Sequence, residues 1–122
     1  MKIKKIDREF SVCKVPDYSL VDMDSDYIFT GSTDEEKSLV CPSEDVPANA
    51  LEVDGGWGAF RIQGPLDFSL IGILAGISGL LAENKIGIFA VSTFDTDYIL
   101  TKKENFQRAL DVLAAAGYEI IN

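Results

Sequence analysis

The stretch AFRIQGP, residues 59–65, followed by LIGILAGISGLLA, residues 70–82, decides the fold. The first part is a short β-rich run that ends in a Gly-Pro turn. In the second part large apolar side chains recur every three or four residues, which predicts a helix with one apolar face. The other face holds glycine, alanine and serine, and each interior glycine lowers helix stability by about 1 kcal/mol relative to alanine. We therefore expect both faces to be buried.

The residues after this helix complete a β-α-β-β-α-β order. IGIFAVST (86–93) and DYILT (97–101) are β-rich and separated by a short turn, which predicts a hairpin. A second helix follows and ends near Gly117, before a last strand over residues 118–121. This order predicts an α+β, ferredoxin-like domain, a four-stranded antiparallel sheet with both helices on one face.

The first half of the chain has a different pattern. Residues 1–54 hold 6 Lys/Arg against 13 Asp/Glu, while residues 55–122 hold 5 against 7. Short apolar runs separated by acidic turns predict strands over residues 10–15, 27–30 and 38–41 and a short helix over residues 42–51. We predict two domains, a degenerate N-terminal copy of the same unit over residues 1–54 and a full unit over residues 55–122.

Composition excludes several classes of function. The net charge of −9 repels phosphate backbones, so we expect no nucleic-acid partner. The chain has no histidine, which excludes Ser-His-Asp and Cys-His catalysis and histidine metal sites. Cys13 and Cys41 are too few for a four-thiolate zinc site, and we expect reduced, buried thiols. We expect no cofactor, no bound metal and no enzymatic activity.

The chain shows no targeting or membrane signal. Residues 1–10 are charged throughout and do not read as a secretory leader. The longest apolar run, residues 68–82, has 15 residues, where a bilayer-spanning helix needs about 20. We therefore expect a cytoplasmic protein without a membrane partner.

The turn into the glycine-rich helix, residues 64–69, is the first candidate site. A helix N-terminus exposes N–H groups and a partial positive charge, which can hold a carboxylate without a basic side chain. The alternative is that Asp67 or Ser69 caps the helix while Gly72 packs against a strand.

The hairpin turn STFDTD, residues 92–97, is the second candidate. Asp97 could act as the counter-ion of an ammonium group, with Thr93 as a hydrogen-bond partner. The alternatives are an ordinary Asp/Thr turn that satisfies its own backbone, and acid-base chemistry by Asp95 with Asp97. Trp57, in a glycine-rich stretch, could line a pocket or join the two halves.

These motifs together resemble the ACT-domain family. The resemblance rests on GPLDFSLIGILA (64–75), GIFA (87–90) and STFDTDYIL (92–100), with FSVCKVP (10–16) and DEEKSLVCP (34–42) in the first half. More narrowly, the chain is similar to small bacterial ACT proteins related to the domains of animal cytosolic arginine sensors. The resemblance implies ferredoxin-like ACT units in tandem that bind a free amino acid at an ACT-ACT interface and form a homodimer.

The resemblance also implies a set of ligand-binding residues. These are Leu70, Gly72, Ile73, Leu74, Thr93, Phe94 and Asp97. The helix N-terminus would hold the α-carboxylate, Asp97 and carbonyls near Thr93 would hold the ammonium, and Phe94 would shield the pair from water.

The sequence departs from the arginine sensors at one of these positions. Those relatives carry an acidic residue where this chain has Leu70, and leucine cannot pair with a basic side chain. An apolar or small amino acid is therefore as well supported as arginine, with Asp67 or an acid of the first half as possible substitutes. An alternative function is a protein-interaction module that keeps the scaffold without a ligand.

Overall fold

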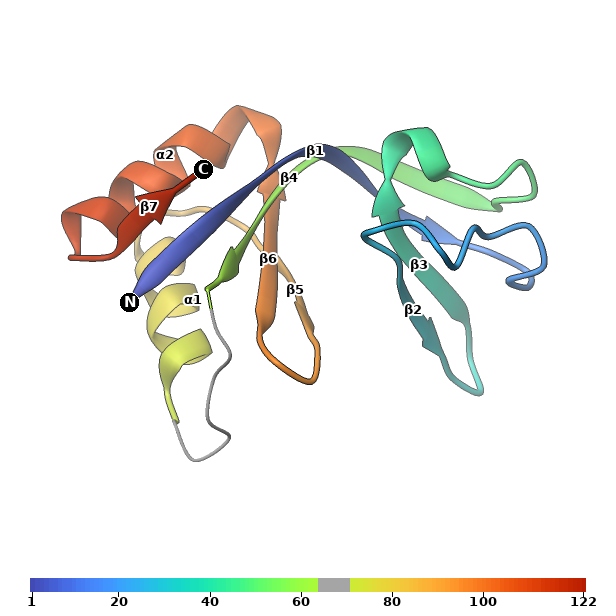
Figure 1. Cartoon of the computed structure of the whole chain (residues 1–122), viewed down its shortest axis with the longest axis horizontal. Coiled ribbons are helices and arrows are strands. Elements are labelled where there is room, and N and C mark those ends of the chain that lie inside the picture. Colours follow the sequence, from blue (N-terminus) through green and yellow to red (C-terminus); the bar gives the residue numbers. More distant parts are fainter. Residues whose placement is uncertain (64–70) are drawn as a thin grey trace. The chain divides into compact units, whose positions relative to one another are not determined.

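The computed structural model describes residues 1–63 and 71–122. Figure 1 shows its elements, which are β1 (Lys2–Lys14), β2 (Phe29–Ser32), β3 (Lys37–Pro42), the 3-10 helix η1 (Ser43–Asp45), β4 (Glu52–Ile62), α1 (Ile73–Glu83), β5 (Phe89–Ser92), β6 (Asp97–Lys102), α2 (Lys103–Ala115) and β7 (Glu119–Ile121). They form two compact units. Unit 1 is Met1–Asp7 with Gly58–Asn122, and unit 2 is Arg8–Trp57. The first seven residues thus lie with the second half of the chain.

Unit 1 follows the order predicted from the sequence. The end of β4, α1, β5, β6, α2 and β7 form the β-α-β-β-α-β unit, an α+β fold of the ferredoxin-like kind. The start of β1 is an additional strand between β4 and β7, so the expected four-stranded antiparallel sheet is wrong in this detail. β7 pairs with Lys2–Lys4 in parallel. The start of β1 was not predicted as a strand, because three of the first five residues are lysines. Its Ile3 and Ile6 are nevertheless buried.

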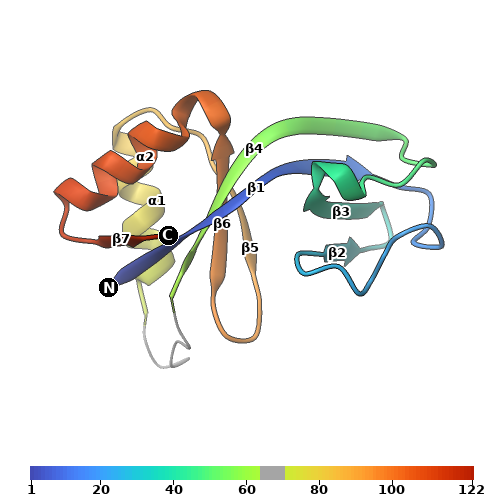
Figure 2. The same ribbon diagram turned by 45° about the horizontal axis from the view of Figure 1, so that its top comes forward.

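Both helices of unit 1 contribute to one apolar core. Ile77 and Leu81 of α1 and Leu113 of α2 are fully buried together with residues of β4 and β6, and Figure 2 shows the two helices on the same side of the strands. Burying a leucine or isoleucine side chain contributes about 1.5–3 kcal/mol. The helices therefore fix the sheet that carries the candidate site.

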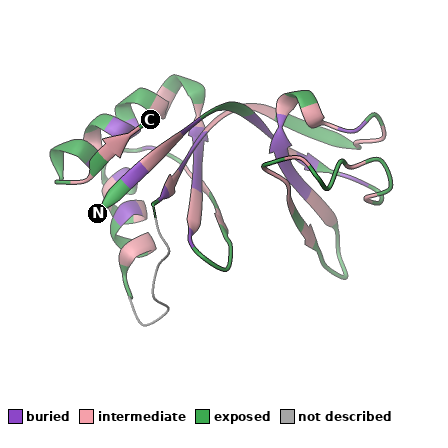
Figure 3. Ribbon diagram, viewed as in Figure 1, coloured by how far each residue is buried: buried purple, intermediate pink, exposed green. Residues whose placement is uncertain are grey.

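The glycine-rich face of α1 is exposed, contrary to the expectation that both faces are buried. Gly76, Gly79 and Ala82 are exposed, and Figure 3 shows exposed (green) segments along this helix. A Cβ atom added at Gly79 would meet nothing within 4 Å. Within the described residues, close packing in the monomer does not account for this glycine.

The end of α2 confirms the expected glycine stop. Gly117 has a φ of 103°, and Tyr118 N–H donates to the Leu113 carbonyl at 3.1 Å. This is the Schellman geometry, in which a left-handed residue lets the chain turn out of the helix. It directs the chain into β7.

Unit 2 has strands in the order β2-β3-β1-β4. Unit 1 has the equivalent order β5-β6-β4-β7, except that the start of β1 is inserted between β4 and β7. Unit 2 has no α-helix where unit 1 has α1 and α2. The helix expected over residues 42–51 is reduced to η1, because Val46 precedes Pro47 and is extended, with ψ of 122°.

The hairpins of the two units match residue for residue. In unit 2 Phe29 pairs with Val40 and Ser32 with Lys37. In unit 1 Phe89 pairs with Leu100 and Ser92 with Asp97, each residue sixty positions later. The chain therefore contains the same hairpin register twice.

Candidate functional site

The turn between β5 and β6 is closed by its own threonines. Thr93 N–H and Thr93 Oγ1 both donate to the Thr96 carbonyl, at 2.8 and 2.9 Å, and Thr96 N–H donates to Thr93 Oγ1 at 3.4 Å. The Thr93 hydroxyl thus serves the turn, as in the ordinary Asp/Thr turn considered from the sequence. This leaves Asp97 as the charged group of the turn with a partly buried side chain.

Thr96 is a residue of the site that the sequence reasoning missed. It is 9% exposed, and its Oγ1 donates to the Ile62 carbonyl at 2.6 Å. The bond ties the hairpin turn to the end of β4, the last strand residue before the loop that leads to α1. A threonine in a turn has no sequence signal for such a partner, because the contact joins residues 34 positions apart.

Asp97 lies at the first position of β6, directly opposite Ser92 of β5. Ser92 Oγ donates to an Asp97 carboxylate oxygen, which orients the carboxylate. An ionised carboxylate has two oxygens with about four acceptor positions, so it can accept further donors such as an ammonium group. Asp95, by contrast, is exposed, which fits a solvated acid rather than a partner in acid-base chemistry.

Two large apolar side chains near the site are uncovered. Phe94 at the tip of the turn is 81% exposed, and Ile71 before α1 is 91% exposed. Most of the Phe94 side chain is therefore in contact with water in the single chain. Large exposed apolar surface is typical of sites that take a ligand or a partner.

The start of α1 supplies backbone donors. Gly72 is the N-cap, with φ of 82°, and the first helical bond runs from Gly76 N–H to the Gly72 carbonyl at 2.8 Å. The N–H groups of Ile73 and Leu74 therefore have no acceptor within the helix, and the helix dipole adds partial positive charge there. Both side chains are half-buried against the core.

The structure brings the two predicted segments to one end of unit 1. The start of α1 and the β5–β6 turn lie at the same end of the sheet in Figures 1 and 2. Leu70, Asp67 and Ser69, which the sequence also pointed to, lie outside the described residues. Trp57 is a half-buried residue of β4 and ends unit 2.

The two cysteines are free and buried in the core of unit 2. Burial raises the pKa of Cys13, and burial together with the neighbouring Cys13 and Asp45 raises the pKa of Cys41 to about 12. Nucleophilic chemistry and metal binding both need the thiolate, so these thiols are structural. Across residues 1–63 and 71–122 no group of three or more His, Cys, Asp or Glu could hold a metal ion.

No helix in the described part of the chain is long and apolar enough to cross a bilayer.

Similarity to known proteins points to one family. A family model described as "ACT domain" matches residues 52–115. The human "Putative protein CASTOR3P" is 32% identical over 102 residues, and the chain covers 60% of its length. That match takes in 79% of this chain.

Two solved structures are also similar. The crystal structure of Atu0741 from Agrobacterium tumefaciens has a TM-score of 0.86 at 31% identity, covering 98% of this chain and 91% of that one. The aspartate kinase of Clostridium acetobutylicum matches with a TM-score of 0.67 at 14% identity, over 93% of this chain and 33% of the kinase. The kinase likeness concerns the fold alone.

Proposed function

Because this chain belongs to the ACT domain family, whose members are regulatory modules that bind amino acids, we propose that it is a non-enzymatic module that binds a free amino acid. The site is formed by the start of α1 and the β5–β6 turn. The N–H groups of Ile73 and Leu74 hold the α-carboxylate, and Asp97 holds the ammonium. Leu70, Gly72 and Thr93 belong to the same set, and Phe94 shields the bound carboxylate and ammonium from water.

One observation carries this proposal. The Asp97 carboxylate is oriented by Ser92 and sits on a turn that Thr96 ties to the end of β4, at the end of unit 1 where α1 begins. A ligand site needs such fixed polar groups, since ordering them on binding would reduce affinity. Glycine at position 72 keeps side-chain atoms away from the first N–H groups.

The proposal includes two ACT units in one chain. Unit 2 has the strand order of unit 1 and the same hairpin register, with a loop and η1 in place of the helices. Unit 2 is then the degenerate ACT unit, and Met1–Asp7 belong to the C-terminal one.

The proposal also places the ligand at an ACT-ACT interface in a homodimer. The support is the uncovered apolar surface beside the site, namely Ile71, Phe94 and the small-residue face of α1. A second chain or the ligand would remove this surface from water. The same surface favours the alternative function, a ligand-free interaction module, in which a partner chain alone covers it.

The test compares two acids of one turn. Asp97→Asn and Asp95→Asn remove the same charge, but only Asp97 is partly buried and held by Ser92. Thermal unfolding with each of the twenty amino acids at millimolar concentration should show a selective rise for the wild type and for Asp95→Asn. A ligand at 100 times its Kd adds about 2.7 kcal/mol of stability. Asp97→Asn should lose this rise. A flat panel for the wild type with an intact dimer would favour the interaction module.

A further inference from the structure

A cavity lies within unit 2, at the end of β1 and the turn between β2 and β3. Its volume is about 250 Å³, and its charged lining comprises Lys14, Lys37, Asp34, Glu35 and Glu36. Sites for drug-sized ligands occupy about 300–1,000 Å³, so this cavity suits a smaller metabolite.

The turn that lines the cavity is built like the turn of the unit 1 site. Thr33 N–H and Thr33 Oγ1 donate to the Glu36 carbonyl at 2.9 and 3.3 Å, and Glu36 N–H donates to Thr33 Oγ1 at 3.2 Å. These are the bonds that Thr93 and Thr96 make sixty positions later. The cavity thus lies, in unit 2, at the hairpin turn equivalent to the one that carries Asp97 in unit 1.

The backbone of the turn leaves its charged side chains available. Asp34, Glu35 and Glu36 are exposed, and the hydrogen bonds that close the turn use only the backbone and Thr33. Within the described part of the chain, no ion pair joins these acids to the two lysines. Five charges of both signs therefore line one cavity without neutralising each other at close range.

The side chains of the two turns differ in charge at several positions, although Glu35 and Asp95 are both acidic. Lys37 stands where unit 1 has Asp97, and Asp34 stands where unit 1 has Phe94. A ligand with an anionic and a cationic group would meet complementary charges of both signs in this cavity. Lys37 also acts on Asp17, whose pKa is lowered mainly by hydrogen bonds from Ser19 and to a lesser extent by this lysine.

We propose that this cavity is a second site for a zwitterionic α-amino acid. Lys14 and Lys37 attract its carboxylate, and the acids of the Thr33–Lys37 turn attract its ammonium. The inference rests on the proposed amino-acid binding and adds that each chain has two sites. Because Lys37 replaces the acid that unit 1 has at Asp97, the two sites prefer different amino acids.

The experiment is a ¹⁵N-¹H NMR titration of the full chain with each of the twenty L-amino acids. The amide signals of residues 33–37 report on the cavity, and those of residues 93–97 report on the site of unit 1. We expect at least one amino acid to shift the first set in a saturable way. Its N-acetyl derivative and its methyl ester, which each lack one charge, should fail to do so.

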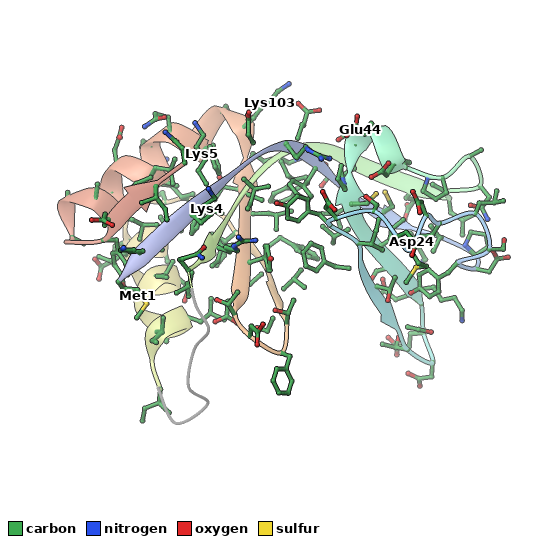
Figure 4. The ribbon with its side chains drawn as sticks, in the orientation of Figure 1. Met1, Lys4, Lys5, Asp24, Glu44 and Lys103 are labelled. Carbon is green, nitrogen blue, oxygen red and sulfur yellow. The ribbon has the colours of Figure 1, made fainter. Side chains whose placement is uncertain are left out.

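A pair of variants tests the role of the lysines. Lys14→Gln/Lys37→Gln should abolish the shifts at residues 33–37 and leave those at residues 93–97 unchanged. Lys103→Gln, an exposed lysine of α2 labelled in Figure 4, is the matched control and should change neither set. Asp97→Asn should abolish the shifts at residues 93–97 and leave those at residues 33–37 unchanged.

The two proposals fail separately in this experiment. If residues 33–37 respond to none of the twenty amino acids, or respond equally in the double variant, the second site does not exist, whatever residues 93–97 do. If residues 33–37 respond while residues 93–97 never do, the unit 1 site is wrong and the cavity stands.

Discussion

The hairpins of the two units share their backbone and differ in their charges. Both place phenylalanine at the first position, serine before the turn and a threonine that closes it, at positions 29, 32 and 33 and again at 89, 92 and 93. The next positions diverge, with Asp34 against Phe94 and Lys37 against Asp97. The turn geometry thus depends on a few backbone and hydroxyl bonds, while the remaining side chains are free to set the ligand chemistry.

The divergence extends to the whole of each unit. Unit 2 holds 3 Lys/Arg against 12 Asp/Glu, whereas unit 1 holds 8 of each. The net charge of −9 is therefore carried by unit 2. Within unit 2 only one cation besides the two lysines of the cavity is present, Arg8, and it lies over the Tyr27 ring and pairs with Glu44 at 3.1 Å. The cavity lysines stand out against this acidic surface, which includes Asp24 and Glu44 in Figure 4.

The largest expected effect concerns the start of β1, which belongs to unit 1. Ile3 is fully buried in the core of unit 1, and Ile3→Ala should lower the free energy of unfolding by about 2–5 kcal/mol, through lost burial and a residual cavity. Urea denaturation followed by circular dichroism measures this change.

The control for that change is Lys2→Ala, one residue away. Lys2 is exposed and pairs with Glu119 at 3.7 Å, and surface pairs contribute about 0–1 kcal/mol. Equal effects of the two substitutions would contradict the assignment of Met1–Asp7 to unit 1.

A smaller effect is expected at Thr96, whose hydroxyl binds the β5–β6 turn to β4. The equivalent residue of unit 2, Glu36, has no hydroxyl. Thr96→Val keeps the shape of the side chain but removes the donor to the buried Ile62 carbonyl, at an expected loss of about 1–3 kcal/mol. It should also weaken amino-acid binding at Asp97, because the turn loses its tie to β4. Unfolding and binding measured on the same variant test both effects.

The equivalent position of unit 2 supplies the control. Glu36 is exposed, so Glu36→Val should change stability by less than about 0.5 kcal/mol. A similar loss in both variants would mean that the Thr96 hydroxyl has no special role.

The sequence predicted those parts of the fold that depend on local patterns. Apolar periodicity located both helices of unit 1 to within a few residues, and Gly117 marked the end of α2. The inserted strand was not predictable in this way, because Lys4 and Lys5 interrupt the alternation that would reveal Ile3 and Ile6. Its pairing with β7 joins the two ends of the chain, which local propensity cannot indicate.

The candidate site was predictable only in its chemistry. The hydroxyls and carboxylates of residues 92–97 marked the turn, and the glycine-rich helix marked the donors. The role of Thr96 depends on a partner distant in sequence, and the exposure of Phe94 depends on what surrounds the turn in three dimensions. The resemblance to ACT domains supplied the link between the two segments, which spacing alone did not contain.

The last expected effect is confined to alkaline pH and uses a pair of equivalent core positions, Cys41 in unit 2 and Thr101 in unit 1. The pKa of Cys41 is raised from 9.0 to about 12, first by burial, so the folded chain holds this proton more tightly than the unfolded chain. The stabilisation is complete below pH 9 and is lost as the pH rises from 9 towards 12, at about 1.4 kcal/mol per pH unit for one proton. Thr101 does not titrate in this range. The free energy of unfolding of the wild type, measured in urea, should therefore fall relative to that of Cys41→Ala in this window. Parallel curves would show that the thiol of Cys41 ionises as readily in the folded chain as in the unfolded one, so that the core of unit 2 would be open to water where that of unit 1 is closed.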